Sequence, residues 1–79
     1  MQYNTYNVIL EGYEAYNQGE EIGLTPEEYA IDFAQGFVFG ECEVSKQSIG
    51  YANYIDTING VGVYYDYGAD YYFFTDETE

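Results

Sequence analysis

With 79 residues, the chain is near the lower limit of what folds without disulfides or metal ions. Fifteen acidic residues face a single cation, Lys46, and no histidine, so the formal net charge is −14. A chain with this charge repels polyanions, which argues against direct binding of nucleic acid. Its 47% hydrophobic and 22% aromatic content nevertheless favours folding over disorder. We therefore expect one folded domain over residues 1–79.

The first segment, residues 3–17, is compatible with two structures. Apolar side chains recur at helical spacing from Tyr6 to Tyr16, and on this pattern we favour a helix. However, Tyr6, Val8 and Leu10 also alternate as the residues of a strand do. Helix and strand therefore both stay open for this segment.

A loop and then a helix are expected next. Residues 17–23 contain two glycines and no apolar run, which predicts a loop. A helix should begin at Pro26, because Thr25 can cap it and Glu28 lies three residues after the cap, as a capping box requires. Spacing along this helix predicts a core-facing side made of Tyr29, Ala30, Phe33, Ala34 and Phe37.

A second helix is expected over residues 46–58. Ser45 can cap it, and Asn59 and Gly60 provide a stop signal. Gly50 within it costs about 1 kcal/mol relative to alanine. Its apolar side would consist of Ile49, Tyr51, Tyr54, Ile55 and Ile58.

The last apolar stretch, residues 61–74, reads as a β-hairpin. We expect a three-residue loop, Asp66 to Gly68, with Gly68 in the left-handed conformation. This register predicts one face that packs on the helices, made of Val61, Val63, Tyr65, Ala69, Tyr71 and Phe73. It predicts an outer face made of Tyr64, Asp70, Tyr72 and Phe74. The fold class is thus α+β, with two or three short helices packed on a small antiparallel sheet that ends in a C-terminal β-hairpin.

The residues for most catalytic and metal chemistry are missing. Without histidine there is no imidazole base, and the one cysteine, Cys42, cannot form an internal disulfide or a thiolate zinc cluster. Cys42 lies between Glu41 and Glu43, whose charge disfavours a reactive thiolate. The spacing of oxygen ligands does not match an EF-hand loop. We expect no enzyme activity, no cofactor and no dedicated metal site. With no signal-peptide pattern and no long apolar span, we expect a cytoplasmic protein.

Charge is the property that points to a function. Duplex DNA carries one charge per about 1.7 Å, so fourteen charges correspond to about 24 Å of DNA. A folded chain of this length has a diameter of roughly 30 Å. Its linear charge density thus approaches that of DNA, and a basic nucleic-acid site could bind it in place of its substrate. The alternative is a non-mimetic adaptor or inhibitor module that binds a protein through an exposed aromatic patch.

In composition the chain resembles the small, acidic, tyrosine-rich DNA-mimic proteins of phages and mobile elements, which include anti-CRISPR and anti-restriction inhibitors. Two stretches are also similar to ArdA-type antirestriction proteins, namely "YNQGEEIG" (Tyr16 to Gly23) and "NYIDTINGVGVYYDYGADYYFF" (Asn53 to Phe74). The resemblance implies an inhibitor that acts in the host cytoplasm. Its partner would be a basic nucleic-acid-binding protein or ribonucleoprotein complex of a host defence system, whose nucleic-acid site it occupies.

The candidate binding surface is an acidic track. It combines acids of the loop before the Pro26 helix, the outer side of that helix, and the hairpin: Glu20, Glu21, Glu27, Glu28, Asp32, Asp66, Asp70 and Asp76. Tyr64, Tyr72 and Phe74 are the aromatic candidates, because clustered exposed rings make binding hot spots. Should this track not be the site, the mimic surface would move to Glu11, Glu14, Glu41 and Glu43. Whether carboxylates or aromatic rings dominate binding is open, as is the oligomeric state.

Overall fold

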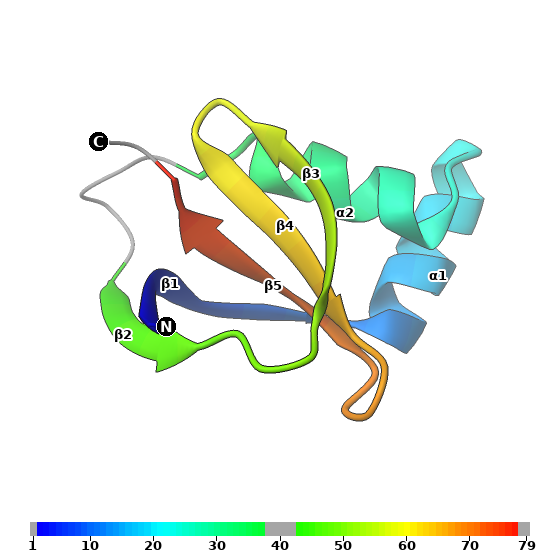
Figure 1. Cartoon of the computed structure of the whole chain (residues 1–79). Helices are drawn as coiled ribbons and strands as arrows, with labels where there is room; N and C mark the ends of the chain where they lie inside the picture. The colour runs from blue at the N-terminus through cyan, green and yellow to red at the C-terminus, as the bar shows by residue number, and fades with distance from the viewer. Residues whose placement is uncertain (1, 38–42, 78–79) are drawn as a thin grey trace.

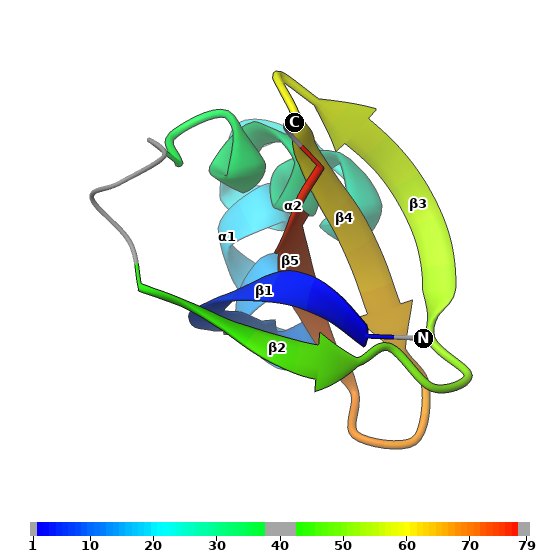
Figure 2. The ribbon, with the colours of Figure 1, turned by 60° about the vertical axis from the view of Figure 1, so that its left-hand side comes forward.

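The computed structural model describes residues 2–37 and 43–77. Its elements are β1 (Gln2–Glu11), α1 (Gly12–Ile22), α2 (Pro26–Ala34), β2 (Val44–Ser48), β3 (Asn53–Ile58), β4 (Val61–Asp66) and β5 (Tyr71–Asp76). The strands form one antiparallel sheet in the order β2-β1-β5-β4-β3. Both helices lie on the same side of this sheet (Figures 1 and 2). The expected α+β fold, with helices on an antiparallel sheet, is confirmed.

The first segment contains both of the structures that its sequence allowed. β1 runs to Glu11 and α1 starts at Gly12, whose backbone N–H donates to the carbonyl of Asp70, 2.9 Å away. The helix prediction is therefore wrong up to residue 11 and right from residue 12. Tyr6 and Leu10 are buried, as the alternation implied, because β1 must cover the core with one face.

The loop predicted for residues 17–23 is also wrong, since α1 continues to Ile22. Its end is fixed by Gly23 in the left-handed conformation (φ 79°), with the Leu24 N–H bonded to the carbonyl of Gly19 at 2.8 Å. Gly19 is not a turn residue. A Cβ there would lie 2.8 Å from the carbonyl oxygen of Leu24 and 3.3 Å from Tyr29, so this glycine allows α1 and α2 to pack closely.

The helix at Pro26 is confirmed, including its capping box. The Thr25 hydroxyl accepts from the Glu28 N–H at 3.2 Å, and the Glu28 carboxylate accepts from the Thr25 N–H at 3.0 Å. Ala30 and Ala34 are buried. The three aromatic residues of the predicted core-facing side pack against the core as expected: Tyr29, Phe33 and Phe37. The last of these follows the helix, which ends at Ala34.

The helix predicted over residues 46–58 is wrong. This segment forms β2, a turn and β3, with Gly50 at φ 64° in the turn. Asn59 and Gly60 have φ values of 51° and 81° and join β3 to β4 as a two-residue hairpin. An Asn-Gly pair between apolar runs is a strong hairpin signal, so local sequence contained the information. Lys46 lies on β2, where a lysine on an edge strand discourages further strand pairing.

The C-terminal hairpin is confirmed, but its predicted register is wrong. The loop spans residues 67–70, and Asp70 (φ 56°), not Gly68, adopts the left-handed conformation. One extra loop residue moves every side chain of β5 to the opposite face. Tyr72 and Phe74 consequently point into the core, paired across from Tyr65 and Val63.

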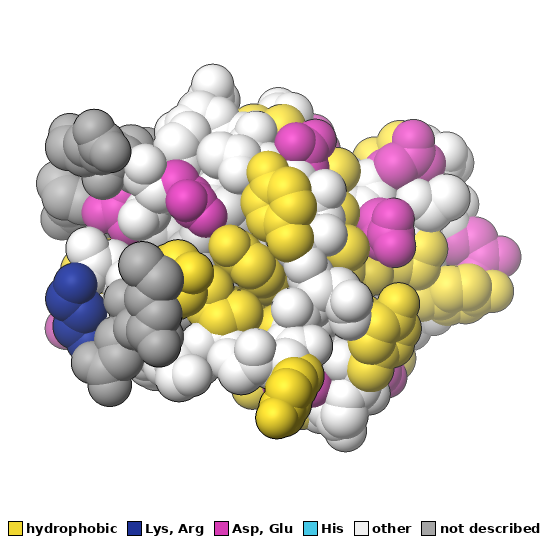
Figure 3. Space-filling model, viewed as in Figure 1, with side chains coloured by type: hydrophobic (Ala, Val, Ile, Leu, Met, Phe, Trp, Pro, Cys, Tyr) yellow, Lys and Arg dark blue, Asp and Glu magenta, His cyan; other side chains and the backbone are white. Residues whose placement is uncertain are grey.

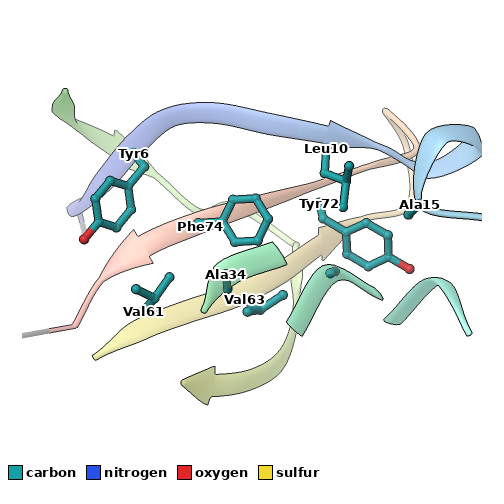
Figure 4. Close-up of a cluster of buried hydrophobic side chains, with 9 residues drawn as sticks. Tyr6, Leu10, Ala15, Ala34, Val61, Val63, Tyr72 and Phe74 are labelled. Carbon is teal, nitrogen blue, oxygen red and sulfur yellow. The ribbon is translucent and has the colours of Figure 1, made fainter. Parts of the chain in front are cut away.

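The core lies between the sheet and the helices (Figure 4). Phe74 is fully buried at its centre, with ring centroids 4.8 Å from Phe37 and 5.5 Å from Phe33. The Tyr6 ring stacks on the Phe37 ring, with their centroids 5.0 Å apart. The remaining buried apolar residues are Leu10, Ala15, Ala30, Ala34, Val61, Val63 and Tyr72. Small alanines on the helices and large rings on the strands let the two layers approach closely.

Candidate partner-binding surfaces

Five predicted acids lie on the two helices, four of them next to the junction and Asp32 in the last turn of α2, and we call them the acidic helix surface: Glu20, Glu21, Glu27, Glu28 and Asp32. All five side chains are exposed. Glu20 and Glu21 end α1, and the others lie on α2 after a connection of three residues. Several carboxylates are visible at the right of Figure 3, where the helices lie. The helical hairpin thus carries all five acids, and its short connection keeps Glu20 and Glu21 near the start of α2.

Of the three hairpin acids, only one lies next to this surface. Asp70 lies beside it, because its carboxylate accepts from Tyr65, which lines one hollow together with Glu27. Asp66 caps the hairpin loop by accepting from the N–H groups of Gly68 and Ala69, at 2.9 and 3.1 Å. Asp76 lies at the far end of β5, about 17 Å from the loop for a six-residue strand. The expected track is therefore not continuous through the whole hairpin.

Two of the aromatic candidates do not lie on an outer face of the sheet. Tyr72 is 4% exposed and Phe74 is 0% exposed, so the prediction that they lie on an outer face is wrong. Tyr64 does lie on the outer face, where its hydroxyl donates to Glu77 at 3.4 Å. The burial of Tyr72 and Phe74 follows from the four-residue loop. Of the alternative acids, Glu11, Glu14 and Glu43 are exposed, whereas Glu41 lies outside the described residues, as does Cys42.

A hollow of about 410 Å³ adjoins the acidic helix surface, and we call it the tyrosine pocket. Its lining combines the start of α2 with the end of the hairpin: Thr25, Pro26, Glu27, Tyr65, Tyr67 and Tyr72. The Tyr65 and Tyr67 rings are nearly perpendicular (88°), with centroids 4.8 Å apart. The Tyr65 and Tyr72 rings lie at 45° with centroids 4.7 Å apart. Sequence reasoning missed this pocket because it depends on the hairpin register.

Hydrogen bonding and burial raise the pKa of two tyrosines that line the pocket. The Tyr65 hydroxyl donates to Asp70 at 2.6 Å, and this bond, with smaller effects of burial and of the Asp70 charge, raises the pKa of Tyr65 to about 12. Burial, followed by the charges of Glu27 and Asp70, raises the pKa of Tyr72. On the outer face, burial and then Glu77 raise the pKa of Tyr64 to about 12.

We expect these tyrosines to make the fold sensitive to alkali. A folded-state pKa near 12, against about 10 in the unfolded chain, means that the native state favours the neutral phenol. The stabilisation is complete below pH 10 and is lost as the pH rises from 10 towards 12. Tyrosinate absorbance during a pH titration should show late-titrating groups. Asp70→Asn, which tolerates the left-handed backbone, should lower the pKa of Tyr65; an unchanged titration would contradict its assignment to the Asp70 bond.

The sheet face opposite the helices carries a second candidate surface, which we call the open face. A row of apolar side chains crosses four strands there, from Ile9 through Phe73 and Tyr64 to Tyr54, each opposite the next. Phe73 and Tyr64 stack at 5.5 Å and 10°, while Ile9 and Tyr54 are 51% and 57% exposed. Hydrophobic side chains gather across the strands in Figure 3. This row is the aromatic patch that sequence reasoning assigned to the wrong residues of β5.

The charge imbalance should limit stability at low salt. Fourteen net negative charges share a molecule of 33 × 26 × 18 Å, and the repulsion between them is screened once the Debye length falls to about 10 Å near 0.1 M salt. We expect sodium chloride between 0.01 and about 0.3 M to raise the melting temperature, by about 4–8 °C for each kcal/mol of repulsion relieved. Sodium sulfate at equal ionic strength is the control, because screening predicts the same rise. A melting temperature that falls with salt would refute this expectation.

Other features of the described residues add no further site. Residues 2–37 and 43–77 contain no group of three His, Cys, Asp or Glu side chains that could hold a metal ion. None of the described helices is both long and apolar enough to cross a membrane. Comparison with protein-family models, curated proteins and solved structures finds no significant match. Charge and surface chemistry are therefore the properties that indicate a function for this protein.

Proposed function

We propose that this protein is a non-enzymatic, acidic DNA mimic. It binds the positively charged nucleic-acid site of a host defence protein or ribonucleoprotein complex, of the CRISPR or restriction type, and blocks DNA binding in the host cytoplasm. The observation that carries the proposal is the net charge of −14 with a single cation. Ordinary soluble surfaces mix charges of both signs, because mixed charges form helix ion pairs and local salt bridges. With a single cation, this chain can form almost none of those ion pairs.

The dimensions support the same reading. The longest axis of 33 Å corresponds to about 2.4 Å per net charge, against about 1.7 Å of axis per charge in duplex DNA. The acidic helix surface concentrates five carboxylates on one helical hairpin. A groove built from lysine and arginine side chains for phosphates can accept carboxylates at this density, and charge would steer the encounter.

The test is competition against DNA on purified defence nucleases and CRISPR surveillance complexes. For at least one of them, the protein should displace labelled DNA and inhibit cleavage. Its affinity should fall by about a thousandfold or more between 50 and 200 mM salt if it replaces six or more phosphate contacts. An affinity that barely changes with salt would rule out charge mimicry, as would inhibition without displacement of DNA.

The open face favours a second candidate, a non-mimetic adaptor or inhibitor module. Half-buried and exposed rings that cluster on one flat surface are typical of interface hot spots. In that case Tyr54→Ala and Ile9→Ala, which remove exposed side chains of the row, would weaken partner binding. That binding would be nearly insensitive to salt, which separates this candidate from mimicry.

A further inference from the structure

We propose that the tyrosine pocket binds an arginine side chain of the partner. This inference rests on the proposed function and deepens it, because it names the group that anchors a basic protein against the acidic helix surface. The pocket is an aromatic hollow with a carboxylate at its rim, and the chemistry of its lining selects the ligand.

The backbone at the helix end that forms one wall of the pocket has few N–H groups left for an anion. Pro26 has no backbone N–H, and the N–H groups of Thr25 and Glu28 are already bonded within the capping box. Glu27 lines the same wall, and the carboxylate of Asp70 accepts from the Tyr65 hydroxyl. Two negative charges around neutral phenol rings make the pocket attractive to a cation.

The rings provide the contact surface for that cation. Tyr67 is 74% exposed and stands perpendicular to Tyr65, so the two form an open corner, with the buried Tyr72 at its base. Cations are attracted to the faces of such rings, and arginine more often than lysine, because the planar guanidinium can stack and donate to a carboxylate at once. Glu27, which lines the pocket, supplies a carboxylate for such a bond. Arginine therefore fits the pocket better than lysine.

A neighbouring hollow supports a cationic partner over a wider area. It shares Thr25 and Pro26 with the tyrosine pocket, and its other side is formed by Tyr16 and Glu20. Tyr16 is 55% exposed, so a ring and a carboxylate again lie together. The helix junction thus presents two adjacent places where a basic surface can insert side chains.

The experiment compares hexa-arginine and hexa-lysine peptides, which carry equal charge, for binding to the intact protein. We expect hexa-arginine to bind about fivefold more tightly, as a cation–π contact at a partly exposed site implies. Tyr67→Ala and Glu27→Gln should each remove most of this preference. Tyr51→Ala, which removes a fully exposed ring elsewhere, and Glu43→Gln, which removes one exposed acid outside the pocket and outside the acidic helix surface, should leave it unchanged.

The outcomes separate this inference from the proposed function. Equal, salt-sensitive binding of both peptides would show that the tyrosine pocket does not select arginine, and would leave charge mimicry standing. A Tyr67→Ala variant with the same arginine preference as Tyr51→Ala would lead to the same conclusion. An arginine preference that depends on Tyr67, without displacement of DNA from any defence protein, would keep the pocket and overturn mimicry. If neither peptide bound, both the pocket and charge mimicry would be overturned.

Discussion

Replacing Phe74 by alanine is expected to lower the melting temperature by about 15–30 °C. Phe74 is fully buried against Phe33 and Phe37, and deletion of such a ring costs about 3–5 kcal/mol. A domain of 79 residues has a total free energy of unfolding of about 4–12 kcal/mol, so the variant would be partly unfolded at physiological temperature. Thermal melts followed by circular dichroism measure the shift.

Phe73→Ala is the matched control, because it removes the same side chain from the adjacent residue on the open face. Phe73 is only half-buried, and its stacking on Tyr64 is a cross-strand pair that contributes about 0.2–1 kcal/mol. If Phe73→Ala proved the more damaging change, the observed register of the hairpin would be wrong. A Tyr72 and Phe74 double alanine is unsuitable as a test of binding, since it would destroy the core.

Reversing Glu20, Glu21 and Asp32 to lysine should weaken binding to the defence partner by a hundredfold or more. Loss of two charge-assisted contacts at about 1.5 kcal/mol each accounts for that factor, and the new repulsion adds to it. The three residues lie in the last turns of α1 and α2, which contain no basic residue. A lysine in a last turn interacts favourably with the negative end of the helix dipole and so stabilises the helix. The variant should be at least as stable as the natural chain. Glu28 is left in place because its carboxylate caps α2.

The control reverses three exposed acids outside the acidic helix surface: Glu14, Glu43 and Asp56. Both variants have a net charge of −8, because each reversal adds two charges to −14. Equal losses of affinity would indicate that total charge, and not this surface, determines binding. Retention of full affinity by the first variant would exclude the acidic helix surface as the site. Competition against DNA at fixed ionic strength provides the measurement.

Of the candidate surfaces, the sequence predicted the acidic helix surface better than the aromatic one. Glu27, Glu28 and Asp32 follow from a helix whose start is encoded locally, and chain proximity keeps Glu20 and Glu21 near them. The aromatic predictions failed for Tyr72 and Phe74 because they depended on a single loop length. The tyrosine pocket and the open face could not be predicted, since each joins side chains from segments far apart in the chain.

The sequence by itself determined the net charge, the start of α2 and the existence of the C-terminal hairpin. These depend on composition or on interactions between residues three or four apart, such as the Thr25 and Glu28 capping box. The tertiary structure decided the end of β1, the strands in residues 44–58 and the face on which each ring of β5 lies. The faces of β5 depended on the length of its hairpin loop. In residues 3–17 helix and strand patterns were both present, and in residues 44–58 the helical spacing competed with the hairpin signal of Asn59 and Gly60. Propensity differences of a few tenths of a kcal/mol per residue could not choose between the two structures. Pairing with distant strands and burial of rings against α2 provided the larger free energy that selected the strands.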